Sequence, residues 1–196
     1  MGFLKKLLLK IDNTFFRWCV RKIYPQYKRP INGYLEHYKV LWTYVFMQKV
    51  LGFNRKVPWP VDFRSRIIGW EFIEKGIICD PGDNLGTYIN ACGGLKFGDN
   101  VELGPNITIV TTNHYKYDVR KTSNKKGVII GNNVWIGSHC VILPGAVIGD
   151  EVTIGAGCVI DKEIPSKSTV VRGDDSIKII PKTKDYEWDI YKEELT

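Results

Sequence analysis

The sequence predicts a mainly β protein whose central part is a parallel β-helix built from six-residue repeats. In residues 130–165 an aliphatic residue returns every six positions, and a glycine follows four of these six residues. This period is neither the 3.6 of an α-helix nor the 2 of a simple strand. It is typical of a coil with three short strands per turn, in which residues about 18 apart stack. The repeated aliphatic positions are Ile130, Ile136, Ile142, Ile148, Ile154 and Ile160.

A second, weaker run of the same period precedes this segment. Its aliphatic and small residues are Ile67, Ile73, Cys79, Leu85, Ala91, Phe97, Leu103 and Ile109. The next repeated position, Ile130, is out of phase with this run, and the phase is restored only if the segment at about 114–128 is an insertion. This segment is polar and basic, which predicts an excursion from the coil. Long loops on regular scaffolds are often functional.

The length of 196 residues predicts one domain with short additions at its ends. We expect a helical segment and extended lead-in over 1–60, the β-helix over 61–181, and a charged tail over 182–196. The prolines of the lead-in at 57–61 exclude a helix interior there. No segment approaches the ~20 apolar residues of a membrane span.

Two amphipathic helices are predicted before the coil. Residues 1–24 combine an apolar stripe with flanking lysines and arginines, a pattern typical of a helix in a membrane interface. The same pattern fits a helix that packs on its own domain or on a partner subunit. Residues 34–51 form the second helix, which ends at Gly52. His37 lies on it and is expected to be structural or to face solvent.

The chain carries a net charge of +7 with a pI of about 9.1. This charge indicates an anionic partner, such as nucleic acid, a membrane surface or a phosphorylated cofactor, or simply a solvated basic surface. The five cysteines form no C-x-x-C pair, which favours reduced thiols in the cytoplasm. Cys140 and Cys158 occupy equivalent positions three repeats apart and are therefore expected to stack, either as small core residues or as a disulfide.

His114 is the candidate for acid–base chemistry. It lies in the run TTNHYKYD, where the coil ends and the inserted loop begins. A neutral imidazole can accept a proton near physiological pH. The alternative is an ordinary loop histidine.

The run GNNVWIGSHCVILPGAVIGDEVTIGAG resembles the hexapeptide-repeat acyltransferases, especially galactoside, maltose and polysaccharide O-acetyltransferases. The resemblance implies a left-handed coil, against the usual right-handed crossover preference, and a homotrimer with active sites between subunits. It also implies acetyl-CoA as the acetyl donor and a sugar hydroxyl as the acceptor. The runs VPWPV and TTNH are similar to the branch that acts on bacterial surface polysaccharides. We therefore expect a cytoplasmic enzyme without a nucleic acid partner, in which residues 1–24 can contact the inner face of the cell membrane.

The resemblance also assigns roles to individual residues. His114 matches the general base, which activates the acceptor hydroxyl for direct attack on the thioester. Small residues at one corner of successive coils match the groove for the pantetheine arm, an aromatic residue lines the cleft, and cations match the phosphate sites. These coenzyme candidates are Ser138, Ala156, Trp135, Lys162, Arg172 and Lys178. The candidates for acceptor binding are Asn90, Asn113 and Tyr115, and no metal ligand is expected.

Three alternatives remain open at this point. An N-acyltransferase acting on an amino sugar would use the same base chemistry. A metal hydrase similar to the γ-class carbonic anhydrases needs three imidazoles, and only His114 and His139 lie in or beside the coils. A non-catalytic trimeric scaffold at the membrane needs no active site.

Overall fold

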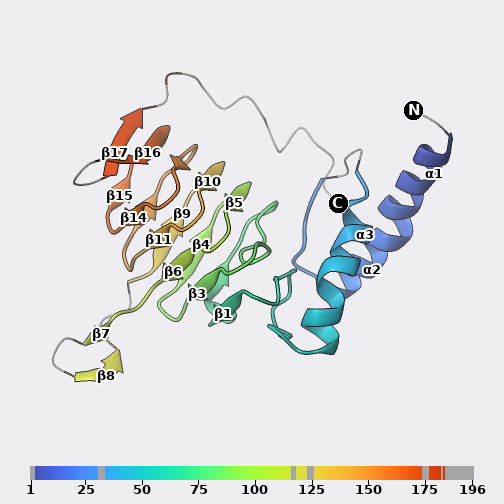
Figure 1. Ribbon diagram of the computed structural model, residues 1–196, viewed down its shortest axis with the longest axis horizontal. Helices are drawn as coiled ribbons and strands as arrows, with labels where there is room; N and C mark the ends of the chain where they lie inside the picture. Colours follow the sequence, from blue (N-terminus) through green and yellow to red (C-terminus); the bar gives the residue numbers. More distant parts are fainter. Residues whose placement is uncertain are drawn as a thin grey trace.

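A computed structural model describes residues 3–30, 34–115, 118–122, 126–173, 177–181 and 183. A helical unit leads into a stack of short parallel strands (Figure 1). The tail predicted over 182–196 lies outside the described residues except at position 183.

The first predicted helix is a continuous helical rod made of α1 (Phe3–Ile11), η1 (Asp12–Phe16, π-helical) and α2 (Arg17–Ile23). The second consists of α3 (Glu36–Val40) and η2 (Leu41–Val50, π-helical), and Gly52 follows it with a positive φ of 97°. Both predicted helices are confirmed. Among the described residues, no helix is long and apolar enough to cross a membrane.

A buried carboxylate joins the two helices. Asp12 accepts hydrogen bonds from the backbone N–H groups of His37, at 3.2 Å, and of Tyr38, at 2.8 Å. It thereby caps the N-terminus of α3, whose first N–H groups have no partner inside the helix. Its Oδ2 also lies 3.0 Å from His37 Nδ1, and both side chains are buried. His37 is therefore structural, and the solvent-facing alternative is wrong.

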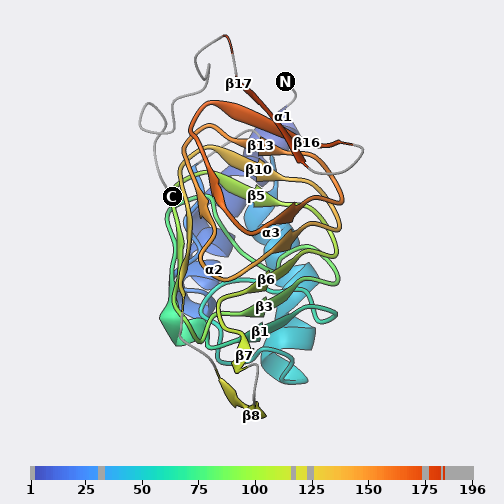
Figure 2. The same cartoon turned by 90° about the vertical axis from the view of Figure 1, so that its left-hand side faces the viewer.

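The strands form three five-stranded sheets, parallel except at β17, that face one another around a shared core (Figure 1). The first sheet contains β1 (Arg66–Ile68), β3 (Tyr88–Asn90), β6 (Thr108–Val110), β11 (Val141–Ile142) and β14 (Val159–Ile160). The second contains β5 (Val101–Leu103), β10 (Val134–Ile136), β13 (Thr153–Ile154), β16 (Ser168–Arg172) and β17 (Ile177–Pro181). The third contains β2 (Ile73–Glu74), β4 (Leu95–Phe97), β9 (Val128–Ile130), β12 (Val147–Ile148) and β15 (Glu163–Ile164). Figure 2 shows β5, β10, β13 and β16 stacked in this order. The predicted parallel β-helix is confirmed.

The pairing of stacked isoleucines in one column gives the number of residues in each coil. Ile142 pairs with Ile160, three repeats further along the chain, as the period of six predicts. Nearer the N-terminus the predicted phase is wrong, because Ile67 pairs with Ile89 rather than with the expected Leu85, which is exposed. Ile89 in turn pairs with Ile109, so both of these coils are slightly longer than three repeats. The additional residues lie in the corners, where they do not disturb the strands.

The inserted segment leaves the coil as a small antiparallel hairpin. Ile109 pairs directly with Ile142, so the chain between them is longer than one regular coil by the length of the predicted insertion. The hairpin consists of β7 (His114–Tyr115) and β8 (Asp118–Thr122) and projects from the stack (Figure 1). At its base the N–H of Lys126 donates to the carbonyl of Thr111 at 3.3 Å, so the chain returns to the point at which it left.

Two elements close the ends of the core. At the first coil, Val57, Trp59 and Val61 of the extended lead-in are buried, and the indole N–H of Trp59 donates to the Pro81 carbonyl at 2.9 Å. At the last coil, β17 turns back and pairs antiparallel with β16. Ile179 of β17 packs against the core, so each end of the coil is at least partly covered.

We expect Ile142→Ala to lower the free energy of unfolding by about 2–5 kcal/mol, because it leaves a cavity in a fully buried column. Chemical denaturation measures this change. Ile129→Ala is the matched control, since the Ile129 side chain points outward and is 48% exposed. The control should change stability by only about 0.5 kcal/mol. Equal losses for both variants would contradict the inward assignment of the repeated isoleucines.

Candidate functional site

His114 lies at the corner between the first and the third sheet, where the hairpin begins. We call this corner the histidine edge; it comprises residues 90–94, 111–114, 143–146 and 161–162 in successive coils. The side chains of Asn113, His114 and Tyr115 are all exposed there. An imidazole at this edge is accessible to a substrate from outside the coil.

Hydrogen bonds between coils fix the backbone just before His114. The buried Thr111 hydroxyl donates to the Asn90 carbonyl at 3.0 Å and accepts the Gly93 N–H at 2.7 Å. The side-chain oxygen of Asn90 accepts the N–H of Cys92 at 3.2 Å. Asn90 therefore lies one coil away from His114 on the same edge, but its side-chain oxygen already supports a turn.

The predicted coenzyme residues Ser138 and Ala156 lie at a different corner, between the second and the first sheet. We call it the glycine edge; it comprises residues 104–107, 137–140 and 155–158. A Cβ on Gly137 would lie 2.6 Å from the Ala156 nitrogen, and one on Gly104 would lie 2.7 Å from the Ser138 nitrogen. These glycines let successive corners approach closely. Within the described part of the chain, the N–H groups of Ser138 and Ala156 donate to no backbone or side-chain acceptor.

The other coenzyme candidates divide between the two edges. Arg172 ends β16 and continues the glycine edge beyond Ala156, because Val170 pairs with Ile154. The backbone of Lys178 lies opposite Val171 on β17. Lys162, in contrast, is exposed on the histidine edge. Trp135 lies on the outer face of the second sheet between Glu102 and Thr153, and its side chain is half exposed.

One chain therefore does not bring all the predicted residues together. Asn90, Asn113, His114, Tyr115 and Lys162 share the histidine edge. Trp135, Ser138, Ala156 and Arg172 gather at or beside the glycine edge. The whole width of the first sheet separates these two groups.

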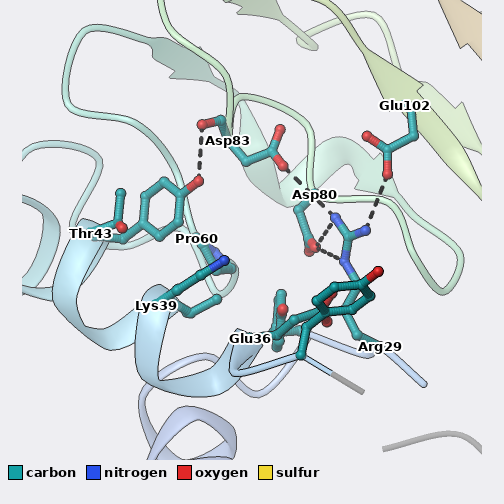
Figure 3. Close-up of a pocket in the computed structure, with 12 residues that line it drawn as sticks. Arg29, Glu36, Lys39, Thr43, Pro60, Asp80, Asp83 and Glu102 are labelled. Atoms are coloured by element: carbon teal, nitrogen blue, oxygen red, sulfur yellow. Dashed lines mark hydrogen bonds and ion pairs between the residues drawn. The ribbon is translucent and has the colours of Figure 1, made fainter. Parts of the chain in front are cut away.

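A pocket that the sequence analysis missed lies between α3, η2 and the turn at residues 80–83 (Figure 3). Its volume is about 430 Å³. The lining residues are mostly polar and come from distant parts of the chain: Tyr27, Arg29, Tyr34, Glu36, Lys39, Val40, Thr43, Tyr44, Pro60, Asp80, Asp83 and Glu102. A proline-rich loop, a helix and two coils contribute, so no local motif marks the pocket.

Arg29 organises the charges of this pocket (Figure 3). Its guanidinium lies 3.1 Å from the carboxylates of Asp80 and Glu102 and 3.8 Å from Asp83. Lys75 approaches the other oxygen of Asp80 at 3.4 Å. Burial alone would lower the Arg29 pKa, but the attraction of Asp80 and the neighbouring acidic groups raises it above its usual range. Arg29 thus stays charged and holds three acidic side chains at one wall.

Asp83 is the carboxyl group in this pocket that titrates near neutrality. Burial and, secondarily, the nearby charge of Asp80 raise its pKa from 3.8 to about 7, although Arg29 opposes the shift. Its carbonyl oxygen also accepts the Tyr44 hydroxyl at 3.2 Å. The pocket therefore gains negative charge as the pH rises through neutrality.

The pocket adjoins the glycine edge. Asn84 donates from its side chain to the Leu103 carbonyl at 2.7 Å, and Asn106 donates from its backbone to Leu85 at 2.9 Å. The turn after Asp83 is thus the first layer of that edge. Glu102 of the pocket is also the immediate neighbour of Trp135 across paired strands. One surface therefore runs from the pocket past Trp135 to the residues of the glycine edge.

His139 and the stacked cysteines of the coils lie at the glycine edge. His139 is exposed on the glycine edge with a positive φ of 60°. Cys140 and Cys158 are free thiols in the core, so the disulfide alternative is wrong. Burial raises the pKa of Cys140, which donates to the Gly155 carbonyl at 3.2 Å. Among the described residues, no three His, Cys, Asp or Glu side chains are grouped so that they can hold a metal ion.

Sequence comparison agrees with the repeat pattern. Residues 127–162 match the family model of the bacterial transferase hexapeptide (six repeats). Galactoside O-acetyltransferase of Escherichia coli K12 is 41% identical over 74 residues, which is 36% of either chain. The Lactococcus lactis galactoside O-acetyltransferase is 46% identical over 72 residues, which is 35% of this chain and 34% of the relative. The chain thus covers about a third of the length of these relatives, and the predicted resemblance to the hexapeptide-repeat acetyltransferases is confirmed over the coils.

Comparison of structures extends the likeness to nearly the whole chain. A galactoside acetyltransferase in complex with coenzyme A has a TM-score of 0.56 and 23% identity, with 95% of this chain and 90% of the other covered. A maltose O-acetyltransferase from Clostridium difficile 630 has a TM-score of 0.54 and 24% identity, with coverages of 91% and 89%. These likenesses support the fold class, a left-handed parallel β-helix with N-terminal helices.

We expect the contribution of Asp83 to the free energy of unfolding to fall as the pH rises from 3.8 to about 7, because the folded chain keeps a proton on Asp83 that the unfolded chain has released. Asp83→Asn removes this contribution, so stability relative to the unmodified chain should increase with pH by at most about 1.4 kcal/mol per unit. Urea denaturation at several pH values measures the difference. Asp161→Asn, at an exposed carboxylate, is the control. Parallel curves for Asp83→Asn and the unmodified chain would contradict the assignment.

Proposed function

We propose that this protein is an O-acetyltransferase that moves an acetyl group from acetyl-CoA to a sugar hydroxyl, with His114 as the general base. One observation carries the proposal: an exposed histidine begins the excursion from a hexapeptide coil whose repeats resemble those of galactoside O-acetyltransferases. An imidazole at this position suits proton transfer to and from a substrate outside the coil.

The reaction needs no covalent intermediate with the enzyme. His114 accepts the proton of the acceptor hydroxyl while the hydroxyl oxygen attacks the thioester carbonyl carbon. The resulting tetrahedral oxyanion collapses, the carbon–sulfur bond breaks, and the coenzyme thiolate takes the proton from the imidazolium. Backbone N–H groups that point to the oxyanion would lower the barrier.

The glycine edge is the proposed site of the coenzyme. Its glycines keep side chains away from the corner, and the N–H groups of Ser138 and Ala156 have no acceptor among the described residues. The amide carbonyls of a pantetheine arm would supply such acceptors. Trp135 offers an apolar wall beside the arm, and Lys162, Arg172 and Lys178 supply cations for the phosphates.

The polar pocket beside Trp135 is the proposed acceptor site. Sugars present several hydroxyl groups, so a site that recognises a sugar needs hydrogen-bond acceptors and donors on opposite sides of the bound molecule. Glu36 and Lys39 of α3 supply both kinds of group in the pocket that Arg29 also lines (Figure 3). Asn113 and Tyr115, which flank His114, and Asn90 would contact the acceptor from the histidine edge.

A complete site requires two copies of the chain. His114 and the glycine edge lie on opposite sides of the first sheet, so one chain cannot bring the base to its own coenzyme candidates. We infer that the histidine edge of one subunit faces the glycine edge of the next, as the predicted homotrimer requires. Lys162 would then reach the coenzyme from the subunit that supplies His114.

Bacterial surface polysaccharide synthesis in the cytoplasm is the proposed setting. The donor acetyl-CoA is an intracellular metabolite, and free thiols at the five cysteines suit a reducing compartment. An amino sugar as acceptor would make the same machinery an N-acyltransferase. A panel of neutral and amino sugars in a coenzyme-release assay separates these two activities from each other and from a non-catalytic scaffold.

We expect His114→Ala to lower kcat about a hundredfold to ten-thousandfold, since general base catalysis contributes this much. The readout is coenzyme A release with an accepted sugar. Acetyl-CoA should still raise the melting temperature of the variant, because the coenzyme site does not depend on the base. Lys96→Ala, at an exposed lysine on β4 outside both edges, should keep full activity. A fully active His114→Ala variant would exclude the role of base.

Glu36→Gln and Lys39→Met should raise the KM for the sugar about tenfold each, because each removes one charged hydrogen bond worth roughly 1.5 kcal/mol. The KM for acetyl-CoA should stay unchanged. Steady-state kinetics with either substrate varied measures both constants. Lys96→Met, at an exposed lysine on β4, is the control. An increase confined to the KM for acetyl-CoA would place the coenzyme, and not the sugar, in the pocket.

A further inference from the structure

We propose that the helical rod formed by residues 3–23 binds the surface of an anionic membrane and lies in its plane. This inference does not depend on the acetyltransferase activity, because it uses only the surface of the N-terminal helices.

An apolar stripe without a partner in the described chain runs along this rod. The residues at positions 4, 8, 11, 15 and 18 follow the spacing of one helix face, and α1 buries none of its side chains. Exposure is high for large residues, at 84% for Phe3, 66% for Leu4 and 59% for Trp18. The exposed members are Phe3, Leu4, Leu7, Leu8, Ile11, Phe15 and Trp18. The rod does pack on its own domain, as one of the predicted alternatives holds, but through its other side, and the stripe has no partner among the described residues.

The charges of the rod have one sign outside the core. Residues 3–23 contain six cationic side chains, at Lys5, Lys6, Lys10, Arg17, Arg21 and Lys22. Their only acidic residue, Asp12, is buried against α3. An apolar stripe flanked only by cations is complementary to a surface that offers both negative charge and hydrocarbon, which an anionic bilayer does.

The same charges disfavour a second copy as the occupant of the stripe. Two rods that met along their apolar faces would bring their lysines and arginines together, and residues 3–23 offer no exposed acidic side chain to offset this repulsion. Large aromatic residues such as Phe15 and Trp18 also suit the boundary between head groups and acyl chains. Since no described helix can span a bilayer, the rod would lie flat at this boundary.

The rod is tied to the rest of the protein on its other side. Val20 and Tyr24 are buried in a cluster with Tyr27 and Val40, and Asp12 caps α3. In Figure 1 α1 extends away from the stacked coils, which leaves its outer surface accessible. A membrane bound to the rod would therefore hold α3 and the coils close to its surface without covering the strands.

The test is sedimentation of the purified full chain with vesicles. Vesicles of equal parts phosphatidylglycerol and phosphatidylcholine should bind the protein, and vesicles of phosphatidylcholine alone should bind it at least about tenfold more weakly. Leu4→Glu/Leu7→Glu/Leu8→Glu should weaken binding to the anionic vesicles about a hundredfold, since it replaces the apolar contact with charge. Lys5→Glu/Lys6→Glu/Lys10→Glu should have an effect of similar size. Neither triple variant should change the melting temperature, because α1 buries no side chain.

Phe72→Glu is the matched control, because Phe72 is a large apolar residue that is 54% exposed away from the rod. It should bind as the unmodified chain does. The proposal is overturned if the unmodified chain does not sediment with anionic vesicles, or if the triple variants bind as well as it does. A lower particle mass of the leucine variant in the absence of vesicles would instead identify a second copy as the occupant, and would also overturn it.

Discussion

The stacking of one coil directly on the next is the constraint on which this structure depends. Neighbouring strands in a sheet are about 4.8 Å apart, so each inward side chain has the same kind of residue above and below it. The column Ile109, Ile142 and Ile160 shows the result: branched aliphatic residues that are fully buried stack through successive coils. A polar residue there would find no hydrogen-bond partner, since the backbone groups are used between coils.

The same constraint determines where chemistry can occur. Strands use their backbone groups for stacking, whereas at the glycine edge the N–H groups of Ser138 and Ala156 have no acceptor among the described residues. At the glycine edge, Gly104 and Gly137 bring corner backbones within contact distance, which excludes side chains from the corner itself. At the histidine edge, the hydrogen bonds of Thr111 hold the last regular coil in place before His114. The coils thus present an accessible backbone at the glycine edge and the projecting side chain of His114 at the histidine edge.

Sequence periodicity predicted the β-helix and the position of the excursion, because inward residues repeat as long as every corner has the same length. It failed for the first coils, where additional corner residues put Ile89 and not Leu85 above Ile67. The pocket around Arg29 could not be predicted from the sequence. Arg29, Asp80 and Glu102 are far apart in the chain, and only the packing of the helical unit on the first coils brings them together. The apolar stripe on residues 3–23 was predicted from the spacing of its residues, but only the structure shows that the side chains of the stripe are exposed.

The way in which the hairpin leaves the coil has a consequence for how such proteins diversify. The chain departs after Thr111 and returns at Lys126, and a backbone hydrogen bond joins these two residues. The stacked strands on either side keep full register across the interruption. A segment with fixed, adjacent ends can be exchanged for one of different length at little entropic cost. Exchange of the residues that follow His114 in this segment would therefore alter the groups that surround it while the scaffold folds as before, which makes the segment a suitable target for directed evolution of the proposed acceptor range.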